Sequence, residues 1–121
     1  MIRVQPDYAL TNYACSIVAV SSALGYIPKN LPKLRSDGWA TLNVTNKFVR
    51  ENLPVKKRVD YRRGERPLLK DLHLDGQAIV CVYGHLIYLD HETYYSFFDN
   101  EEDEVVAVWI LENRDNRLKL L

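Results

Sequence analysis

Helical spacing of apolar positions marks the first half of the chain. Between residues 12 and 24, apolar and small side chains recur three and four positions apart, which predicts a largely buried helix. Asn12 is suited to be its N-cap, and Gly25 is a natural C-terminal stop. A second helix is predicted over residues 42–51, with Thr41 as its N-cap.

From residue 55 onward the pattern changes to the period of two that is typical of strands. Helices followed by an antiparallel meander make an α+β plan, in which an N-terminal helix packs on a C-terminal antiparallel sheet. The 121 residues contain no internal repeat and no linker, so we expect residues 1–121 to form a single domain. Strands are predicted over residues 55–62, 77–83, 85–89, 94–98 and 105–111, with a short helical turn at 67–73.

The balance of charge argues against one class of function. With 16 basic and 16 acidic residues the formal net charge is zero, whereas nucleic-acid-binding proteins are usually strongly basic, so no nucleic-acid partner is expected. A basic stretch at residues 56–66 and an acidic one at 101–104 are either solvated regions or a docking surface for a charged partner. The chain shows no signal peptide and no apolar run long enough to span a membrane, so we expect a cytoplasmic protein with reduced cysteines and no membrane partner.

Cys15 and His85 are the residues with the clearest chemical potential. Cys15 falls near the start of the first predicted helix, where the partial positive charge of a helix N-terminus favours the reactive thiolate. His85 follows Gly84 and opens a predicted strand, and the glycine permits a bend or a close approach of another backbone. Each alone has a structural explanation, as a small buried side chain or as a core or rim histidine. Together with a carboxylate on the return strand, they follow the order of a Cys–His–Asp site for nucleophilic catalysis.

Three segments carry a resemblance to a known family. Residues 12–26 resemble the nucleophile helix of the C39-like group within the papain-like cysteine peptidase superfamily. Residues 84–90 are similar to its Gly-His pair followed by an apolar strand, and residues 94–100 are similar to its return strand, which carries an acid. Small papain-like proteins encoded by bacteriophages are the most similar group. The resemblance implies a papain-like fold and a cysteine peptidase or amide hydrolase that acts on a peptide or isopeptide substrate.

The resemblance also implies roles for individual residues. It makes Cys15 the nucleophile, His85 the base and then the acid, and Asp99 the group that orients the imidazole ring. An amide side chain assists the oxyanion in the family, and Gln5 or Asn12 corresponds to it here. These five residues form the expected site.

Departures from the family pattern leave the orienting group open. The first acid of the return strand falls on Ser96, and Asp99 stands an odd number of positions further on, so in a regular strand the two residues face opposite sides. The third residue is therefore Asp99 from beyond the strand end, or Ser96, or Asn100. An imperfect orienter motivates an alternative function, a catalytically degenerate scaffold, phage-encoded and located in the host cytoplasm, that binds a host protein.

Metal and cofactor chemistry has no recognisable motif in the chain. The 2 cysteines and 3 histidines form neither a Cys-x-x-Cys nor a His-Glu-x-x-His pattern, so we expect no metal and no cofactor. Cys81 lies in the middle of an apolar run and is expected to fill the core. Trp109 is expected to do the same.

Overall fold

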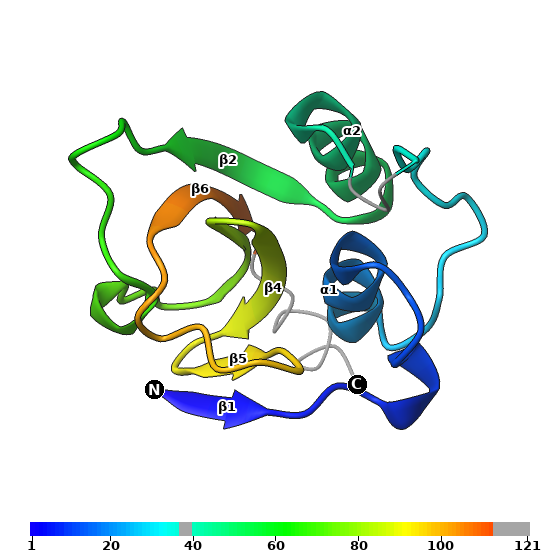
Figure 1. Cartoon of the computed structure of the whole chain (residues 1–121), viewed down its shortest axis with the longest axis horizontal. Coiled ribbons are helices and arrows are strands. Elements are labelled where there is room, and N and C mark those ends of the chain that lie inside the picture. The colour runs from blue at the N-terminus through cyan, green and yellow to red at the C-terminus, as the bar shows by residue number, and fades with distance from the viewer. Residues whose placement is uncertain (37–39, 113–121) are drawn as a thin grey trace.

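The computed structural model describes residues 1–36 and 40–112. Within these residues two α-helices pack on a mostly antiparallel sheet of six strands, so the protein has an α+β fold (Figure 1). Two short 3₁₀ turns lie at Tyr8–Leu10 and Leu69–Asp71. The helices are α1 (Cys15–Leu24) and α2 (Leu42–Asn52), and the strands are β1 (Ile2–Val4), β2 (Val55–Asp60), β3 (Gln77–Val82), β4 (His85–Asp90), β5 (Thr93–Tyr95) and β6 (Val105–Leu111).

Across the sheet the strands follow the order β1-β5-β4-β3-β6-β2. The interior strand β3 pairs antiparallel with two neighbours, so that Ile79 lies opposite Tyr88 of β4 on one side and Trp109 of β6 on the other. At one edge β1 runs parallel to β5, and at the other edge β2 runs antiparallel to β6. Apolar side chains are concentrated on the interior strands because both faces of these strands are covered.

A tight hairpin turn between β3 and β4 places His85 at the first position of β4. Val82 pairs with His85, so only Tyr83 and Gly84 connect β3 to β4. Gly84 has a φ of +78°, a left-handed conformation that glycine adopts without steric cost. The glycine that interrupts the apolar run in the sequence therefore reverses the chain, and the two halves of the run lie side by side.

The two faces of the sheet bury separate hydrophobic clusters. On one face, Val20 of α1 and Phe48 of α2 belong to the same cluster as Trp109 of the sheet. On the other face, Val80 and Ile87 lie in a second cluster, around which the sheet curves strongly (Figure 1). Fully burying one such side chain contributes roughly 1.5–3 kcal/mol, so the first cluster, which contains residues of both α1 and β4, stabilises the position of α1 on the sheet.

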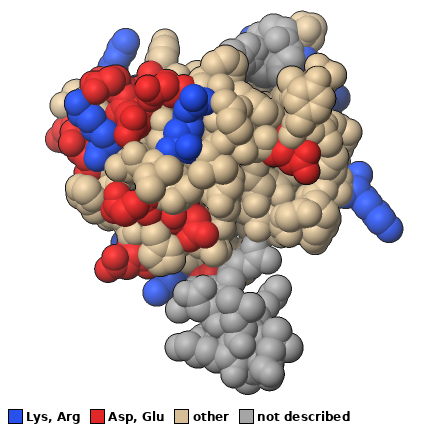
Figure 2. Space-filling model, turned by 90° about the horizontal axis from the view of Figure 1, so that it is seen from below, with Lys and Arg blue, Asp and Glu red and all other residues tan. Residues whose placement is uncertain are grey.

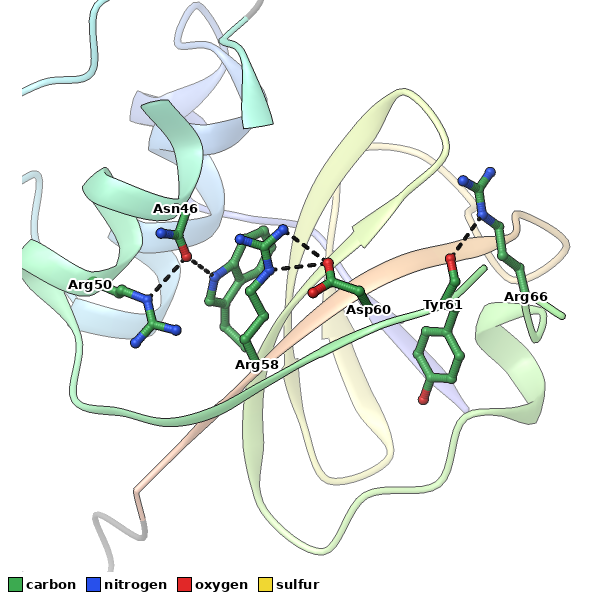
Figure 3. Close-up of polar contacts among 7 residues, drawn as sticks. Asn46, Arg50, Arg58, Asp60, Tyr61 and Arg66 are labelled. Carbon is green, nitrogen blue, oxygen red and sulfur yellow. Dashed lines mark hydrogen bonds and ion pairs between the residues drawn. The ribbon is translucent and has the colours of Figure 1, made fainter. Parts of the chain in front are cut away.

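Trp109 joins α2 to the sheet through its indole ring. The side chain is fully buried, as expected from the sequence, and its Nε1 donates a 2.9 Å hydrogen bond to Asn46 Oδ1 (Figure 3). Arg50 Nε donates to the same oxygen at 3.1 Å. The guanidinium of Arg58 lies 5.2 Å from the ring centroid and is held by the carboxylate of Asp60. The indole N–H of Trp109, which is the only polar group of that side chain, therefore has a hydrogen-bond acceptor although the ring is buried.

Charged side chains are unevenly spread over the surface. Figure 2 shows carboxylates and cations interspersed over one part of the face, and a largely uncharged remainder toward the side on which Figure 1 places α1. One of the ion pairs joins Lys70 Nζ to Glu102 Oε1 at 2.7 Å. Neither helix in the described part of the chain is long and apolar enough to cross a bilayer.

The helix boundaries differ from the sequence prediction in one respect that matters for the site. The second helix and its Thr41 cap are confirmed, because the Thr41 side chain accepts a hydrogen bond from Val44 N. The first helix, predicted to start at residue 12, begins only at Cys15 and has Ala14 as its N-cap residue. The prediction that Asn12 is the N-cap is therefore wrong, because the chain turns through a 3₁₀ segment before the helix starts.

Candidate active site

Cys15 is the first residue of α1, at the positive end of the helix. Ala14 offers no side-chain cap, and its carbonyl accepts hydrogen bonds from both Ile17 N and Val18 N. The backbone N–H groups of Leu86, Ser16 and Cys15 itself lie near the Cys15 sulfur, and their positive ends lower the pKa of the thiol. Burial has the larger effect and raises the pKa of Cys15 above its ordinary value, so the resting group is a thiol.

His85 is the first residue of β4 and is half-buried. Its Nε2 lies 3.3 Å from Ser96 Oγ, and its ring meets the ring of Phe98 edge-on, with 5.5 Å between centroids. Burial lowers the pKa of His85, and the negative charge of Asp103 partly offsets this effect. The resting imidazole is therefore neutral near pH 7 and able to accept a proton.

The sulfur of Cys15 and the ring of His85 belong to one surface region. Leu86, whose N–H reaches the sulfur, is the residue next to His85, and all three residues line the same two cavities. The larger cavity has a volume of about 460 Å³, and Tyr13 and Phe98 form part of its wall. An aromatic-walled hollow therefore opens directly beside the thiol and the imidazole.

The second cavity lies toward α2 and has a volume of about 280 Å³. Leu42 and Tyr83 contribute exposed apolar surface at this cavity, and Ser16 lies within its lining. The Ser16 hydroxyl is buried and has no hydrogen-bond partner among the described residues. Neither cavity is lined by a Lys, Arg, Asp or Glu side chain of the described chain. The two cavities share Cys15, His85 and Leu86 and are together called the groove, whose lining by the described residues is mostly apolar and contains no Lys, Arg, Asp or Glu.

Asp99 lies in the turn after β5, exposed to solvent, and its carboxylate is used locally. Asp99 Oδ1 accepts hydrogen bonds from Tyr94 OH at 3.3 Å and from Glu101 N at 3.1 Å. The strand predicted over residues 94–98 ends at Tyr95, and the residue that contacts the His85 ring is Ser96, the alternative raised by the odd spacing.

Gln5 and Asn12 are the two amide side chains expected to assist the oxyanion. Gln5 is exposed and lines a cavity that also involves Ser21 and Tyr26, at the opposite end of α1 from Cys15. Asn12 is exposed on the segment that precedes the helix. Backbone N–H groups of Leu86 and Ser16 also lie near the Cys15 sulfur. The sequence gives no signal for this arrangement, because backbone donors carry no residue identity.

Cys81 is the second cysteine of the chain and lines the cavity toward α2 together with Cys15. It is partly buried and packs against the same hydrophobic cluster, in keeping with its expected place in the core. Burial, followed by the proximity of Cys15, raises the pKa of Cys81 to about 11. Cys81 is therefore the less reactive thiol of the two. Within the described residues, no group of three His, Cys, Asp or Glu side chains is placed to hold a metal ion.

Comparison with known proteins assigns no family to the chain. No protein-family model, no curated protein and no solved structure matches it. The chemistry of the Cys15 region therefore carries the functional interpretation.

Proposed function

We propose that the chain is a papain-like cysteine peptidase or amide hydrolase in which Cys15 is the nucleophile and His85 the general base. One observation carries this proposal: Cys15 at the N-terminus of α1 and His85 at the start of β4 line the same two cavities, and the backbone N–H of Leu86, the residue that follows His85, lies near the Cys15 sulfur. An N-terminal nucleophile helix packed on an antiparallel sheet also suits a papain-like fold.

The reaction starts from a neutral pair. Burial keeps Cys15 a thiol and His85 an unprotonated imidazole, so proton transfer accompanies attack of the sulfur on the substrate carbonyl carbon. The developing oxyanion is stabilised by backbone N–H groups at the start of α1, which have no partners within the helix. The imidazolium then gives its proton to the leaving amine as the C–N bond breaks, and water hydrolyses the resulting thioester.

The lining of the groove indicates the class of substrate. Because no Lys, Arg, Asp or Glu side chain of the described chain lines either cavity, a charged side chain next to the scissile bond would lose its hydration without gaining a partner. An extended peptide or isopeptide with uncharged, apolar flanking groups suits the surface formed by Tyr13, Phe98, Leu42 and Tyr83.

A covalent probe tests the proposal directly. Wild-type protein incubated with a peptidyl vinyl sulfone should gain one adduct on Cys15, located by mass spectrometry of the digested chain. Cys15→Ala should abolish this adduct, and Cys81→Ala should retain it, because the second thiol has the higher pKa. Equal labelling of Cys15→Ala and wild type would overturn the assignment of the nucleophile.

A second candidate function is a catalytically degenerate papain-like scaffold that binds a host protein. The observation that favours it is the hydroxyl, rather than a carboxylate, beside His85 Nε2, together with a Cys15 thiol whose pKa is raised. Under this proposal the apolar groove is a binding surface. Cys15→Ala would then retain the same partner from a bacterial lysate, and no peptide in an uncharged library would be cleaved by the wild-type chain.

A further inference from the structure

Ser96 is the first member of a buried chain of hydrogen bonds that leads away from His85. The Ser96 and Asn100 side chains are almost completely buried, at 1% and 5% exposure. Ser96 Oγ lies 2.6 Å from Asn100 Oδ1, and Asn100 Nδ2 lies 2.7 Å from Asp103 Oδ2. Phe98 N also donates to Ser96 Oγ, at 3.1 Å. The ring of His85 is thereby linked to a carboxylate through two uncharged side chains.

The donors and acceptors along these hydrogen bonds determine which nitrogen of the His85 ring carries the proton. The Asp103 carboxylate accepts only, so the amide nitrogen of Asn100 faces it and the amide oxygen faces Ser96. The single hydroxyl proton of Ser96 is donated to that oxygen. The Ser96 oxygen can then only accept, from Phe98 N and from His85 Nε2. Nε2 of His85 therefore carries the proton, and Nδ1 keeps the lone pair that acts as a base.

We propose that Ser96, Asn100 and Asp103 are positioning residues that hold His85 in the Nε2–H tautomer and supply the negative charge that stabilises its protonated form. The inference rests on the proposed function, because it assigns a role to groups that act only through His85. When the imidazole takes up the thiol proton, the hydrogen bond from Nε2 to Ser96 becomes charge-assisted, and the carboxylate at the end of the chain opposes the positive charge.

Two nearby carboxylates provide a matched comparison. Asp103→Asn keeps an oxygen that accepts from Asn100 Nδ2 but removes the charge. Asp99→Asn removes a charge four positions away, on a side chain that contacts Tyr94 and Glu101 rather than this hydrogen-bond chain. Two titratable side chains bear on the His85 ring: Cys15 of α1, which lines the same cavities, and Asp103 in the turn before β6, whose charge raises the pKa of His85.

Nitrogen-15 NMR of the imidazole tests the proposal without requiring catalysis. In the full chain, neutral His85 should show the Nε2–H tautomer, and Asp103→Asn should lower the pKa of His85, whereas Asp99→Asn should leave it unchanged. Ser96→Ala should convert the single tautomer into a mixture. A dominant Nδ1–H tautomer in the wild type, or equal His85 titrations of wild type and Asp103→Asn, would overturn the proposal.

Kinetics separates this inference from the proposed hydrolase function. On a cleaved peptide, Asp103→Asn should lower kcat by about tenfold, a fraction of what general acid–base catalysis contributes, and leave KM unchanged. The acid limb of kcat/KM should move to lower pH together with the His85 titration. If every variant is inactive while the NMR titrations behave as expected, the positioning chain stands and the hydrolase function fails. If Asp103→Asn is as active as the wild type, the positioning role fails.

Discussion

The Ser96 hydroxyl lies 3.3 Å from His85 Nε2, where a Cys–His–Asp site would place a carboxylate. A neutral hydroxyl orients the ring, but it stabilises an imidazolium less than a carboxylate in direct contact would. Burial lowers the pKa of His85, so the site starts from an uncharged imidazole. The consequences of this arrangement are measurable in stability as well as in reactivity.

Removing the Ser96 hydroxyl should destabilise the fold. In Ser96→Ala the buried Asn100 Oδ1 and the Phe98 N–H each lose a partner, and an unsatisfied buried group costs about 1–3 kcal/mol. The free energy of unfolding from urea titrations measures this loss. The matched control is Ser16→Ala, which removes a buried hydroxyl that has no hydrogen-bond partner within residues 1–36 and 40–112 and should change stability by less than about 0.5 kcal/mol. Equal losses in the two variants would contradict the prediction.

The rate of Cys15 alkylation should rise with pH through neutrality and beyond. Because burial raises the pKa of the Cys15 thiol, the thiolate fraction increases about tenfold per pH unit up to that pKa. Iodoacetamide modification, followed by mass spectrometry between pH 6 and 10, measures the profile. In Cys15→Ala the remaining label should appear only at higher pH, because burial, the larger cause of the raised Cys81 pKa, is still present in this variant. A rate plateau below pH 7 would indicate a preformed thiolate–imidazolium pair and contradict the prediction.

The sequence was sufficient for the parts of the fold that periodicity encodes. Apolar spacing predicts α2 and the strand over residues 105–111, and the order of helices followed by strands predicts the α+β fold that the structure has. Strand β1 was missed because three residues are too few to show a period, and its exposed Ile2 and Arg3 carry no burial signal. The strand over residues 94–98 was drawn too long because the run of aromatics continues past Tyr95, where the chain leaves the sheet.

The candidate site was predictable only in part for a related reason. Cys15 and His85 stand out because a thiol at a predicted helix start, followed later by an imidazole at a predicted strand start, matches the order of a Cys–His–Asp site. The spacing of Ser96 and Asp99 makes Ser96 an alternative orienting residue, but nothing in the sequence pattern points to Asp103. Its link to His85 runs through the Asn100 side chain, and such a relay depends on turn geometry that residue types alone do not determine.

Stability should fall as the pH drops below about 6.5, because of His85. In the unfolded chain this residue binds a proton with its ordinary pKa of about 6.5, whereas burial lowers its pKa in the fold. The unfolded state therefore binds more protons between the two values, so stability is present above the unfolded pKa and is lost toward the folded one. Urea midpoints at pH 7.5, 6.5 and 5.5 measure the slope. His85→Gln should flatten it, and an unchanged slope in this variant would contradict the prediction.

Asn46 should be the most sensitive polar residue on α2. In Asn46→Ala the buried Trp109 Nε1–H loses its acceptor, and Arg50 Nε loses the same oxygen, so unfolding should become about 1–3 kcal/mol easier (Figure 3). Asn43→Ala makes the same change at an exposed position of the same helix and corrects for helix propensity. The free energy of unfolding and the tryptophan emission maximum report the effect together, because a released indole N–H admits water and shifts emission to longer wavelength. If both asparagine variants unfold alike, the Asn46–Trp109 hydrogen bond contributes nothing, and only apolar packing would then hold α2 against the sheet.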